Sequence, residues 1–427
     1  GLCGISCARI FQLAEIIYLR RIKRDTKKYY LKNGAGFITS HNRKYQRHSV
    51  DFTFSDEQRL LKDSVSRFVA ENYGLEARRK LVSSEDGFGL QNWKTYAELG
   101  WLAVPFSEDS GGLGGGPVEV MVLMEAFGRG LVVEPFISTI ILSANLIEAL
   151  ATQKQISQIL PAVIGGEEFV SFAHVEAQAR FNLGDITTKA ELAGTGYRIS
   201  GQKVVVFGGD KANKFVVSAR TSGNQRDQDG ISLFLVDAEA SGISRRGYQT
   251  VDGMRAADVA LNNVMVDKAS LLGEEGNAFL TIENIIDRAT AAVCAEAVGI
   301  MDSLHEQTLE YLNTREQFGV KLGKFQALQH RSVDMFIACQ EARSMTYLAT
   351  LSLDKPRPER IRAVSGAKSH IGKAGRLVGQ EAVQMHGGMG MTDELAIGHY
   401  FKRLTMIDTL FGNTDHHLER FSTVAHN

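Results

Sequence analysis

Cysteine and long apolar runs are both scarce in this chain. Its 427 residues include only four cysteines, Cys3, Cys7, Cys294 and Cys339. None has the spacing of a metal site, and four scattered thiols do not form the disulfide framework of a small secreted protein. The most apolar window, residues 131–147, is interrupted by Glu134 and Pro135. We therefore expect no metal ion, no stable membrane span and a reducing, cytoplasmic location.

Basic charge is scarce outside the first 49 residues. Residues 1–49 hold 11 Lys and Arg against two acids, Glu15 and Asp25, which leaves 37 basic and 47 acidic residues in 50–427. An acidic body argues against nucleic acid as the main partner. The chain is long enough to bury a large core, and its 44% apolar content is ordinary for a globular protein.

Methionine is absent before Met121, and the 49-residue leader differs from everything after it. Apolar residues between Ile10 and Leu19 fit one helix face, and a basic run follows at 20–28. Three interpretations are open: a targeting segment, a helix on a membrane surface, or translated sequence upstream of the native start. The abrupt change at Val50 to Val-Asp-Phe-Thr-Phe-Ser-Asp-Glu-Gln favours the third, with a GTG start codon and a non-native or disordered leader. The intact mass of the protein made from its native gene distinguishes them.

Periodicity divides the remaining chain into three parts. Residues 50–166 show a helical spacing of apolar residues, and Ser55 with Gln58 predicts a capping box. Residues 167–273 carry short β-rich segments between Gly, Asn and Asp turns. Residues 274–427 return to helices. The predicted fold class is α+β, with an N-terminal helical domain, a middle antiparallel β domain and a C-terminal domain of the four-helix-bundle type.

The predicted elements have the following bounds. The strands cover 169–174, 187–192, 197–200, 203–207, 215–220, 231–236 and 256–261. The long C-terminal helices cover 278–312, 325–353 and 359–386, and two shorter ones cover 399–411 and 414–424.

Two glycine-containing segments are candidates for phosphate binding. The loop Gly111–Gly116 has no Walker lysine, no G-x-G-x-x-G spacing and no preceding strand, so a structural loop is the simpler interpretation. In Tyr-x-x-x-Arg-Glu-Gln-Phe-Gly at 311–319, Arg315 ends a long predicted helix. Its guanidinium either complements the helix dipole or binds a phosphate bidentately.

Two further segments lie near the C-terminus. In Gln-Met-His-Gly-Gly-Met-Gly at 384–390, a helix cap explains one glycine, but three within four positions indicate close approach of the backbone to a ligand. His386 alone is more typical of a buried structural histidine. In Leu-Phe-Gly-Asn-Thr-Asp-His-His-Leu at 410–418, Asn413 or Thr414 is a candidate N-cap. The adjacent histidines point to different helix faces, which argues against a shared metal ion.

The order of the parts and these segments together resemble the acyl-CoA dehydrogenase family over essentially all of 50–427. The resemblance is carried by Phe-Ser-Asp-Glu-Gln at 54–58, Pro-Phe-Ser-Glu-Asp-Ser-Gly-Gly-Leu-Gly at 105–114, and the segments at 315–319 and 384–390. The stretch His-Tyr-Phe-Lys-Arg-Leu-Thr-Met-Ile-Asp-Thr-Leu-Phe-Gly at 399–412 is similar to the small subunits of pimeloyl-CoA dehydrogenases within that family.

The resemblance implies FAD held between subunits, and hence a homo-oligomer or a hetero-oligomer with a second acyl-CoA dehydrogenase chain. It assigns the FAD contacts to Arg315, Phe318, Gln326, Gln384, Gly388, Thr414 and His416. Arginine suits a diphosphate, and glycines let the backbone approach it. The match is weaker around the flavin ring. There His174–Arg180 replaces Thr-Glu-Pro-Gly-x-Gly-Ser-Asp, and Val205–Gly208 replaces Trp-x-Thr-Asn.

The family's catalytic carboxylate is missing. The implied reaction removes a proton from Cα and a hydride from Cβ of an acyl thioester, and the base is usually the Glu of Tyr-Glu-Gly-Thr. Gly412 occupies that position and cannot accept a proton. Some members place the Glu on the long helix before an Arg, and Asp287-Arg288 resembles that pair, although an ungapped match through 295–300 places Ala289 there. Asp287 is thus a candidate base and Arg288 a candidate substrate contact, with a surface ion pair as the alternative.

Two functions follow from the resemblance. The first is an FAD-dependent acyl-CoA dehydrogenase of fatty acid β-oxidation that passes electrons to an electron-transfer flavoprotein or similar acceptor. Its substrate would include a dicarboxylyl thioester such as pimeloyl-CoA. The second is a non-catalytic subunit that completes the FAD site of a catalytic chain, and an oxidase on the same fold is a third possibility.

Overall fold

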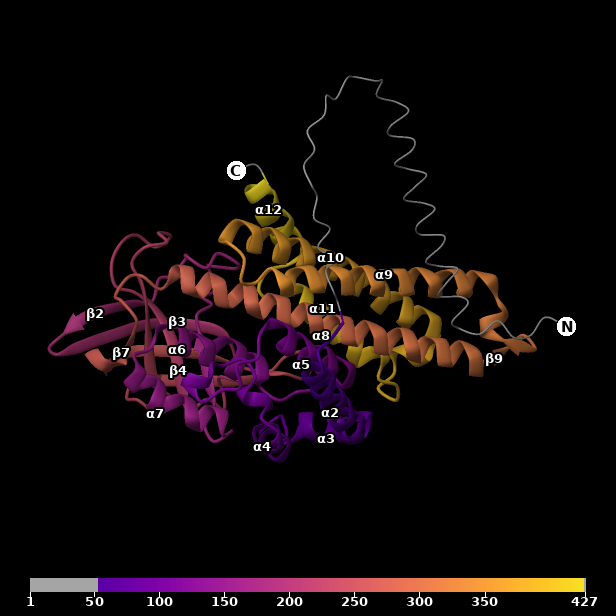
Figure 1. Cartoon of the computed structure of the whole chain (residues 1–427), viewed down its shortest axis with the longest axis horizontal. Helices are drawn as coiled ribbons and strands as arrows, with labels where there is room; N and C mark the ends of the chain where they lie inside the picture. The colour runs from indigo at the N-terminus through magenta and orange to yellow at the C-terminus, as the bar shows by residue number, and fades with distance from the viewer. Residues whose placement is uncertain (1–52, 426–427) are drawn as a thin grey trace, which may run out of the picture. The chain divides into compact units, whose positions relative to one another are not determined.

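The computed structural model of the protein describes residues 53–425. The leader, with Cys3 and Cys7 and the three interpretations of residues 1–49, lies outside the described residues. From residue 54 the chain runs through short helices, then a sheet, then long helices, which confirms the predicted fold class (Figure 1). None of the described helices combines the length and apolar character that crossing a membrane requires.

Short helices form the N-terminal part. They are α2 (Asp56–Asn72), α3 (Leu75–Ser83), α4 (Leu90–Glu98), α5 (Pro117–Gly130), α6 (Asn145–Leu150) and α7 (Gln153–Ile164), with 3-10 turns η1 (Trp101–Ala103) and η2 (Glu108–Ser110). The predicted capping box is confirmed, because Ser55 Oγ accepts from Gln58 N at 3.2 Å and Gln58 Oε1 accepts from Ser55 N at 3.0 Å. Within the part with predicted helical spacing, one segment is a π-helix, η3 (Phe136–Ala144). Such wide turns are frequent at functional sites.

The middle part is a mixed sheet with the strand order β6-β7-β3-β2-β4-β5-β8. The strands are β1 (Val170–Ala173), β2 (Lys189–Ala193), β3 (Gly196–Phe207), β4 (Lys214–Arg220), β5 (Ile231–Asp237), β6 (Ile243–Gln249), β7 (Arg255–Asp267) and β8 (Leu271–Leu272), and the turn η4 (Lys268–Ser270) precedes β8.

Three details differ from the sequence-based expectation for this sheet. Most pairs are antiparallel, but β1 pairs with β4 in parallel, because the chain crosses over through β2 and β3 before it returns beside β1. The two strands expected at 197–200 and 203–207 are one bulged strand, β3. The edge strand β6 was not predicted, because Arg245, Arg246 and Gly247 hide its alternation.

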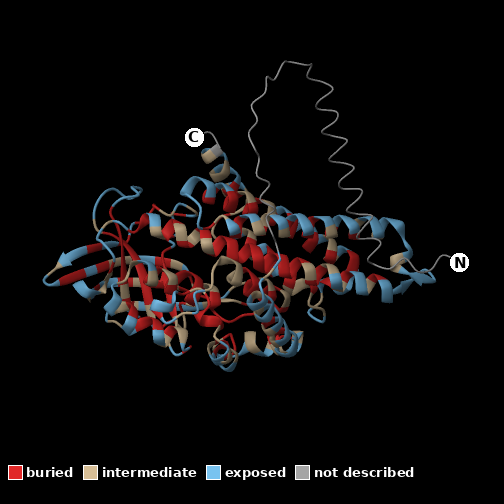
Figure 2. Ribbon diagram, viewed as in Figure 1, coloured by how far each residue is buried: buried red, intermediate tan, exposed pale blue. Residues whose placement is uncertain are grey.

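Long helices form the C-terminal part: α8 (Phe279–Thr314), α9 (Gln326–Leu351), α10 (Arg357–His386), α11 (Ile397–Thr409) and α12 (Thr414–Ala425). A small hairpin of β9 (Glu316–Gln317) and β10 (Val320–Lys321), followed by η5 (Leu322–Lys324), joins α8 to α9, and η6 (Gly387–Met391) follows α10. Figure 2 shows the buried stripe along α8. There α5 and α8 cross so closely that a Cβ on Gly128 or Gly299 would collide with a backbone carbonyl oxygen of Glu296 or Glu125.

A fully buried polar network ties the loop after β1 to the sheet. Lys203 Nζ donates to Glu176 Oε1 at 2.8 Å, to Ser218 Oγ at 3.1 Å and to the His174 carbonyl at 3.2 Å. His174 Nδ1 lies 3.0 Å from Ser218 Oγ. Burial lowers the pKa of Lys203 to about 8, and burial together with the Lys203 ammonium lowers the pKa of His174 to about 3.

This network predicts acid sensitivity. The imidazole of His174 takes up a proton near its ordinary pKa of 6.5 when unfolded, but near 3 when folded. The stability that neutral His174 contributes is therefore present above pH 6.5 and is lost progressively down to pH 3, by about 2–3 kcal/mol over the first two pH units. We expect His174→Asn to flatten the fall in thermal midpoint over those units, whereas the same change at exposed His330 leaves it unchanged. Parallel profiles for the wild type and His174→Asn would contradict this.

Candidate functional site

One end of the helical bundle gathers five of the predicted cofactor contacts. The rings of Tyr311 and His386 stack with centroids 4.4 Å apart, which joins the ends of α8 and α10. Arg315 and Phe318 follow Tyr311, Gln326 begins α9 beside them, and Gln384 and Gly388 flank His386. All five residues are exposed.

The exposed groups at this end suit a diphosphate and an aromatic base. Arg315 has no acidic partner among the described residues, and Phe318 is 90% exposed with a φ of 54°. A Cβ built on Gly387 or Gly388 meets no atom within 4 Å, so both backbones face open space. A free guanidinium can bind phosphate through two parallel hydrogen bonds, and an exposed ring can stack on a base. This end therefore fits the diphosphate and adenine of a dinucleotide.

The turn between α11 and α12 holds the position where the family's carboxylate is missing. Gly412 has a φ of 117°, and a Cβ there would lie 2.8 Å from His417 Nε2 and closer still to the His416 ring. The buried Lys368 Nζ donates to the carbonyls of Asp408 at 3.0 Å and Gly412 at 2.5 Å. Burial lowers the pKa of Lys368 to about 8. This turn is closed around a residue without a side chain.

The other two predicted cofactor contacts lie beside this turn, away from the bundle end. Thr414 Oγ1 donates to Asp408 Oδ1 at 2.8 Å, and Asn413 Oδ1 accepts from His416 N at 3.0 Å. Asn413 is thus the N-cap of α12, one of the two alternatives left open by the sequence. The His416 ring lies 5.3 Å from that of Phe181, in a groove formed by residues 179–183, the start of α8 and α12. The cofactor roles of Thr414 and His416 stay predictions.

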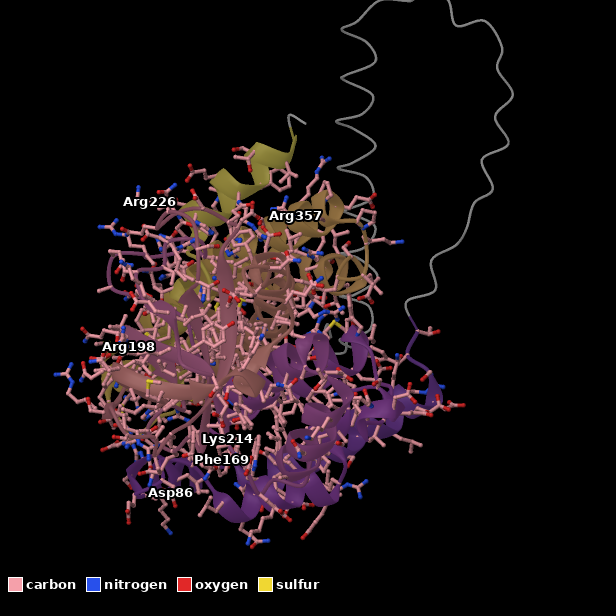
Figure 3. The ribbon with its side chains drawn as sticks, turned by 90° about the vertical axis from the view of Figure 1, so that its left-hand side faces the viewer. Asp86, Phe169, Arg198, Lys214, Arg226 and Arg357 are labelled. Atoms are coloured by element: carbon pink, nitrogen blue, oxygen red, sulfur yellow. The ribbon has the colours of Figure 1, made fainter. Side chains whose placement is uncertain are left out.

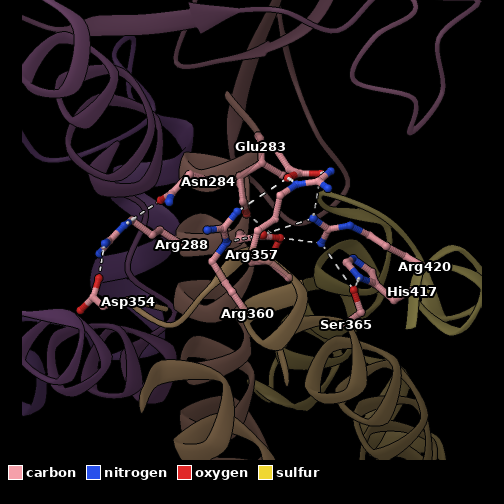
Figure 4. A network of polar contacts seen from close by, with 12 residues as sticks. Glu283, Asn284, Arg288, Asp354, Arg357, Arg360, Ser365, His417 and Arg420 are labelled. Atoms are coloured by element: carbon pink, nitrogen blue, oxygen red, sulfur yellow. Dashed lines mark hydrogen bonds and ion pairs between the residues drawn. The ribbon is translucent and has the colours of Figure 1, made fainter. Parts of the chain in front are cut away.

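Asp287 lies in an ion network with Arg360 and Arg420, and Figure 4 labels these two arginines. Its side chain is fully buried and accepts from Arg360 Nε at 2.9 Å and from Arg420 Nη1 at 2.5 Å. Glu283, one turn earlier on α8, accepts two hydrogen bonds from Arg357, at 2.5 and 2.8 Å. Asp287 therefore forms ion pairs, as the alternative interpretation of its sequence position predicted, but these pairs are buried and do not lie on the surface. Both oxygens of Asp287 are occupied by guanidinium groups, which disfavours its predicted role as a base.

Arg288 points to a different place from Asp287. Its Nε donates to Asn284 at 3.1 Å and its Nη2 to Asp354 at 2.5 Å. It lines a small pocket together with Gly115 and Gly116 of the glycine-rich loop. The structure thus brings that loop to Arg288 but places neither with the turn at Gly412, and the role of Arg288 as a substrate contact stays a prediction.

A largely apolar cavity adjoins Phe411, the neighbour of Gly412. It is lined by aromatic and aliphatic side chains from α5, η3 and the end of β3, including Phe127, Phe136 and Phe207. Phe169 and Lys211 also line the cavity, and Lys211 Nζ forms an ion pair with Asp86 Oδ1 at 2.8 Å. Figure 3 labels Phe169 and Asp86. Each cation of the lining has an acidic partner: Lys211 has Asp86, Arg255 has Asp210, and Arg403 has Glu296 and Asp252.

Two positions expected to contact a flavin ring carry hydrocarbon side chains. They are Val205 and Phe207, where the family has an indole and a hydroxyl group. The Val204 N–H donates to the Val175 carbonyl at 2.8 Å, and the Val205 N–H donates to Asp258 at 3.4 Å. These two backbone N–H groups are therefore not free to donate to the polar edge of a flavin ring. The residues present therefore fit FAD at the bundle end and fit it poorly at the ring.

Sequence reasoning missed the charged residues buried around the cavity. Arg403 donates to Glu296 through Nε at 2.6 Å and Nη2 at 2.8 Å, and to Asp252 through Nη1 at 2.7 Å. Glu134 accepts from Gly89 N and Asn92 Nδ2, both at 3.1 Å, and its hydroxyl donor is Tyr73. Burial raises the pKa of Glu134. The sequence did contain an indication of them. Glu296 lies within the alanine-rich run of α8, and Glu134 lies within the apolar run at 131–142, where an acidic residue is unusual.

Comparison with known proteins agrees with this architecture. Residues 55–167, 171–267 and 279–425 match the N-terminal, middle and C-terminal domains of acyl-CoA dehydrogenase. The short-chain specific acyl-CoA dehydrogenase of Clostridium acetobutylicum is 27% identical over 374 residues, 86% of this chain and 97% of that protein.

Two solved structures are also similar. A variant of the Tcur3481–Tcur3483 steroid ACAD is 28% identical with a TM-score of 0.78, and the match covers 87% of this chain and 98% of that one. The ChsE4–ChsE5 complex from Mycobacterium tuberculosis is 24% identical with a TM-score of 0.80, over 88% and 99%. With all three domains matched in order, the chain belongs to the acyl-CoA dehydrogenase family of FAD-dependent oxidoreductases.

Proposed function

We propose that this chain is a subunit of a heteromeric acyl-CoA dehydrogenase and that its bundle end completes an FAD site on a partner chain. The observation that carries the proposal is the contrast between the two ends of the site. The turn at Gly412 is closed to any side chain, whereas Arg315, Phe318 and Gly388 are exposed. FAD, when bound, supplies the acceptor for the electrons removed from the acyl group. The partner supplies the carboxylate that takes the proton.

Association with another chain is supported by the surface of α9. This helix exposes four large apolar side chains, Val333, Ile337, Leu348 and Leu351, each about half exposed. Phe318 adds a nearly fully exposed ring at the bundle end. Apolar groups gathered on one element favour a protein interface. The similar ChsE4–ChsE5 structure is described as a complex of two proteins, which supports association with a second protein.

A self-sufficient dehydrogenase is the second candidate, and the cavity beside Phe411 favours it. A cavity with a largely apolar lining next to the turn at Gly412 suits an acyl chain. A dicarboxylyl thioester such as pimeloyl-CoA is less well matched, because every cation of the lining already has an acidic partner and Glu134 adds a carboxylate. The base would be a carboxylate other than one at position 412, and an electron-transfer flavoprotein is the proposed acceptor for either candidate.

The visible spectrum of the purified protein tests the proposal. The chain should be purified alone and with a co-expressed family member that has the intact carboxylate, then treated anaerobically with a series of acyl-CoAs. We expect little flavin in the chain alone, and flavin that bleaches only in the complex. Flavin that is retained by the chain alone and bleached by an acyl-CoA would replace the proposal with the second candidate.

Removing Arg315 is expected to weaken FAD retention in that complex. Loss of charge-assisted hydrogen bonds to a diphosphate costs about 1.5–3 kcal/mol, or roughly ten- to hundredfold in the dissociation constant. Fluorescence of FAD released on dilution measures the effect for Arg315→Ala. Arg226, whose side chain is 74% exposed on the middle domain (Figure 3), provides the matched control. Equal FAD affinity in both variants would remove Arg315 from the site.

A further inference from the structure

The cavity beside Phe411 contains oxygen atoms that the protein does not satisfy. Thr139 and Asp210 line it, and each has a buried side-chain oxygen without a hydrogen-bond partner among the described residues. Ser171, whose Oγ also has no partner there, lies behind Gly208, where a built Cβ would be 3.3 Å from that oxygen. Leaving a buried polar group unpaired costs about 1–3 kcal/mol. Two such atoms in the lining of one cavity, with a third behind Gly208, indicate a polar group in its ligand.

Asp210 shows what kind of group is missing. Arg255 approaches it from one side, so that Nε donates to Oδ2 at 2.7 Å and Nη2 forms an ion pair with the same oxygen at 2.6 Å. A fork-like pair normally uses both carboxylate oxygens, but here Oδ1 is left without a donor in a side chain that is only 7% exposed. A carboxylate oxygen accepts and never donates. The ligand must therefore bring an O–H or N–H group.

Charge restricts the ligand further. The pairing of Asp210 with Arg255 leaves no net charge there, and Lys211 and Arg403 are also paired with acids. Glu134, in the same lining, has hydroxyl, amide and backbone donors but no cation among its partners. A second carboxylate on the acyl chain would find no unpaired positive partner and would lose its hydration on burial. An uncharged hydroxyl meets the requirement of Asp210 without that penalty.

We propose that this cavity binds an acyl-CoA whose acyl chain carries a hydroxyl group, and that Oδ1 of Asp210 accepts the hydroxyl proton. The inference rests on the proposed function in one respect, that the ligand is an acyl-CoA thioester. It concerns binding and not turnover, so it holds whether or not the chain reacts with its ligand. The η3 wall contributes Thr139, whose buried hydroxyl also has no partner among the described residues.

Calorimetric titration of the full-length protein, with the flavin or partner that purifies with it, tests the proposal. Octanoyl-CoA is compared with octanoyl-CoAs that carry one hydroxyl at or next to the chain end. We expect one hydroxylated isomer to bind about ten- to hundredfold more tightly than octanoyl-CoA, because a hydrogen bond to a charged group contributes that much. Asp210→Asn should reduce the preference to less than about tenfold, since Arg255 takes the amide oxygen and the NH2 group can only donate a neutral hydrogen bond to the hydroxyl oxygen.

Control variants and outcomes separate the possible causes. Asp185→Asn breaks another arginine–aspartate pair, with Arg226, outside the cavity and should keep the preference. Equal binding of octanoyl-CoA and all hydroxylated isomers overturns the inference while leaving the proposed function intact, and this comparison needs only the wild type. If Asp210→Asn lowers FAD retention and the wild type shows no hydroxyl preference, the donor belongs to the flavin, which also overturns it. If no acyl-CoA binds, both the inference and the acyl-CoA ligand fail.

Discussion

Replacing Arg403 by leucine is expected to lower the free energy of unfolding by about 3–5 kcal/mol, the typical cost of removing one partner from a buried ion pair. Arg403 is 5% exposed and lies between Glu296 of α8 and Asp252 of the middle domain. Nearby, Arg78 of α3 donates to the carbonyls of Asp252 at 2.6 Å and Leu131 at 3.0 Å. Without the guanidinium, two buried carboxylates face each other unpaired where all three domains meet.

Urea unfolding followed by circular dichroism measures this change. The matched control is Arg246→Leu, because Arg246 also pairs with an aspartate, Asp258, but its side chain is 81% exposed. Exposed pairs contribute about 0–1 kcal/mol. A loss below about 1 kcal/mol for Arg403→Leu would show that the two acids are satisfied in some other way, as by taking up a proton.

Restoring the family's glutamate by Gly412→Glu is expected to give no dehydrogenase activity and to destabilise the protein by about 2–4 kcal/mol. A residue other than glycine in such a backbone conformation costs about 1–3 kcal/mol. The collision of Cβ with the His416 and His417 rings adds to this cost. His417 cannot easily move aside, since its Nδ1 lies 3.2 Å from Ser365 Oγ and its Nε2 lies 3.1 Å from the Phe411 carbonyl oxygen.

Two measurements test this expectation. Thermal unfolding of Gly412→Ala isolates the cost of the Cβ, and Gly388→Ala is the control, because a Cβ at that exposed glycine meets no atom within 4 Å. Anaerobic bleaching of flavin by acyl-CoAs tests for activity in Gly412→Glu. Bleaching by a folded Gly412→Glu protein would contradict the view that the turn is built for glycine, and would make the chain a dehydrogenase that lost only its base.

Several elements were predictable because local physics decides them. The capping box of Ser55 and Gln58 depends on residues three apart, and the end of α10 at His386 follows from the glycines after it. The closeness of Arg315 and Phe318 was also predictable, since they lie within one short segment, whereas their cofactor roles stay predictions. The parallel pairing of β1 and the π-helix of η3 were not, because both depend on what the rest of the chain packs against them.

The sequence by itself determined the three-part organisation, the bundle-end residues and the absence of a side chain at position 412. These properties belong to periodicity and residue identity. Only the tertiary structure decided that Gly412 is enclosed by His416 and His417, that Asp287 is held by Arg360 and Arg420, and that Asp210 keeps an unpaired oxygen. Each of these features depends on contacts between residues far apart in the chain or on the residues that enclose a turn. Burial makes such contacts energetically important, because an unpaired polar or charged group inside a protein has no water to hydrogen-bond with.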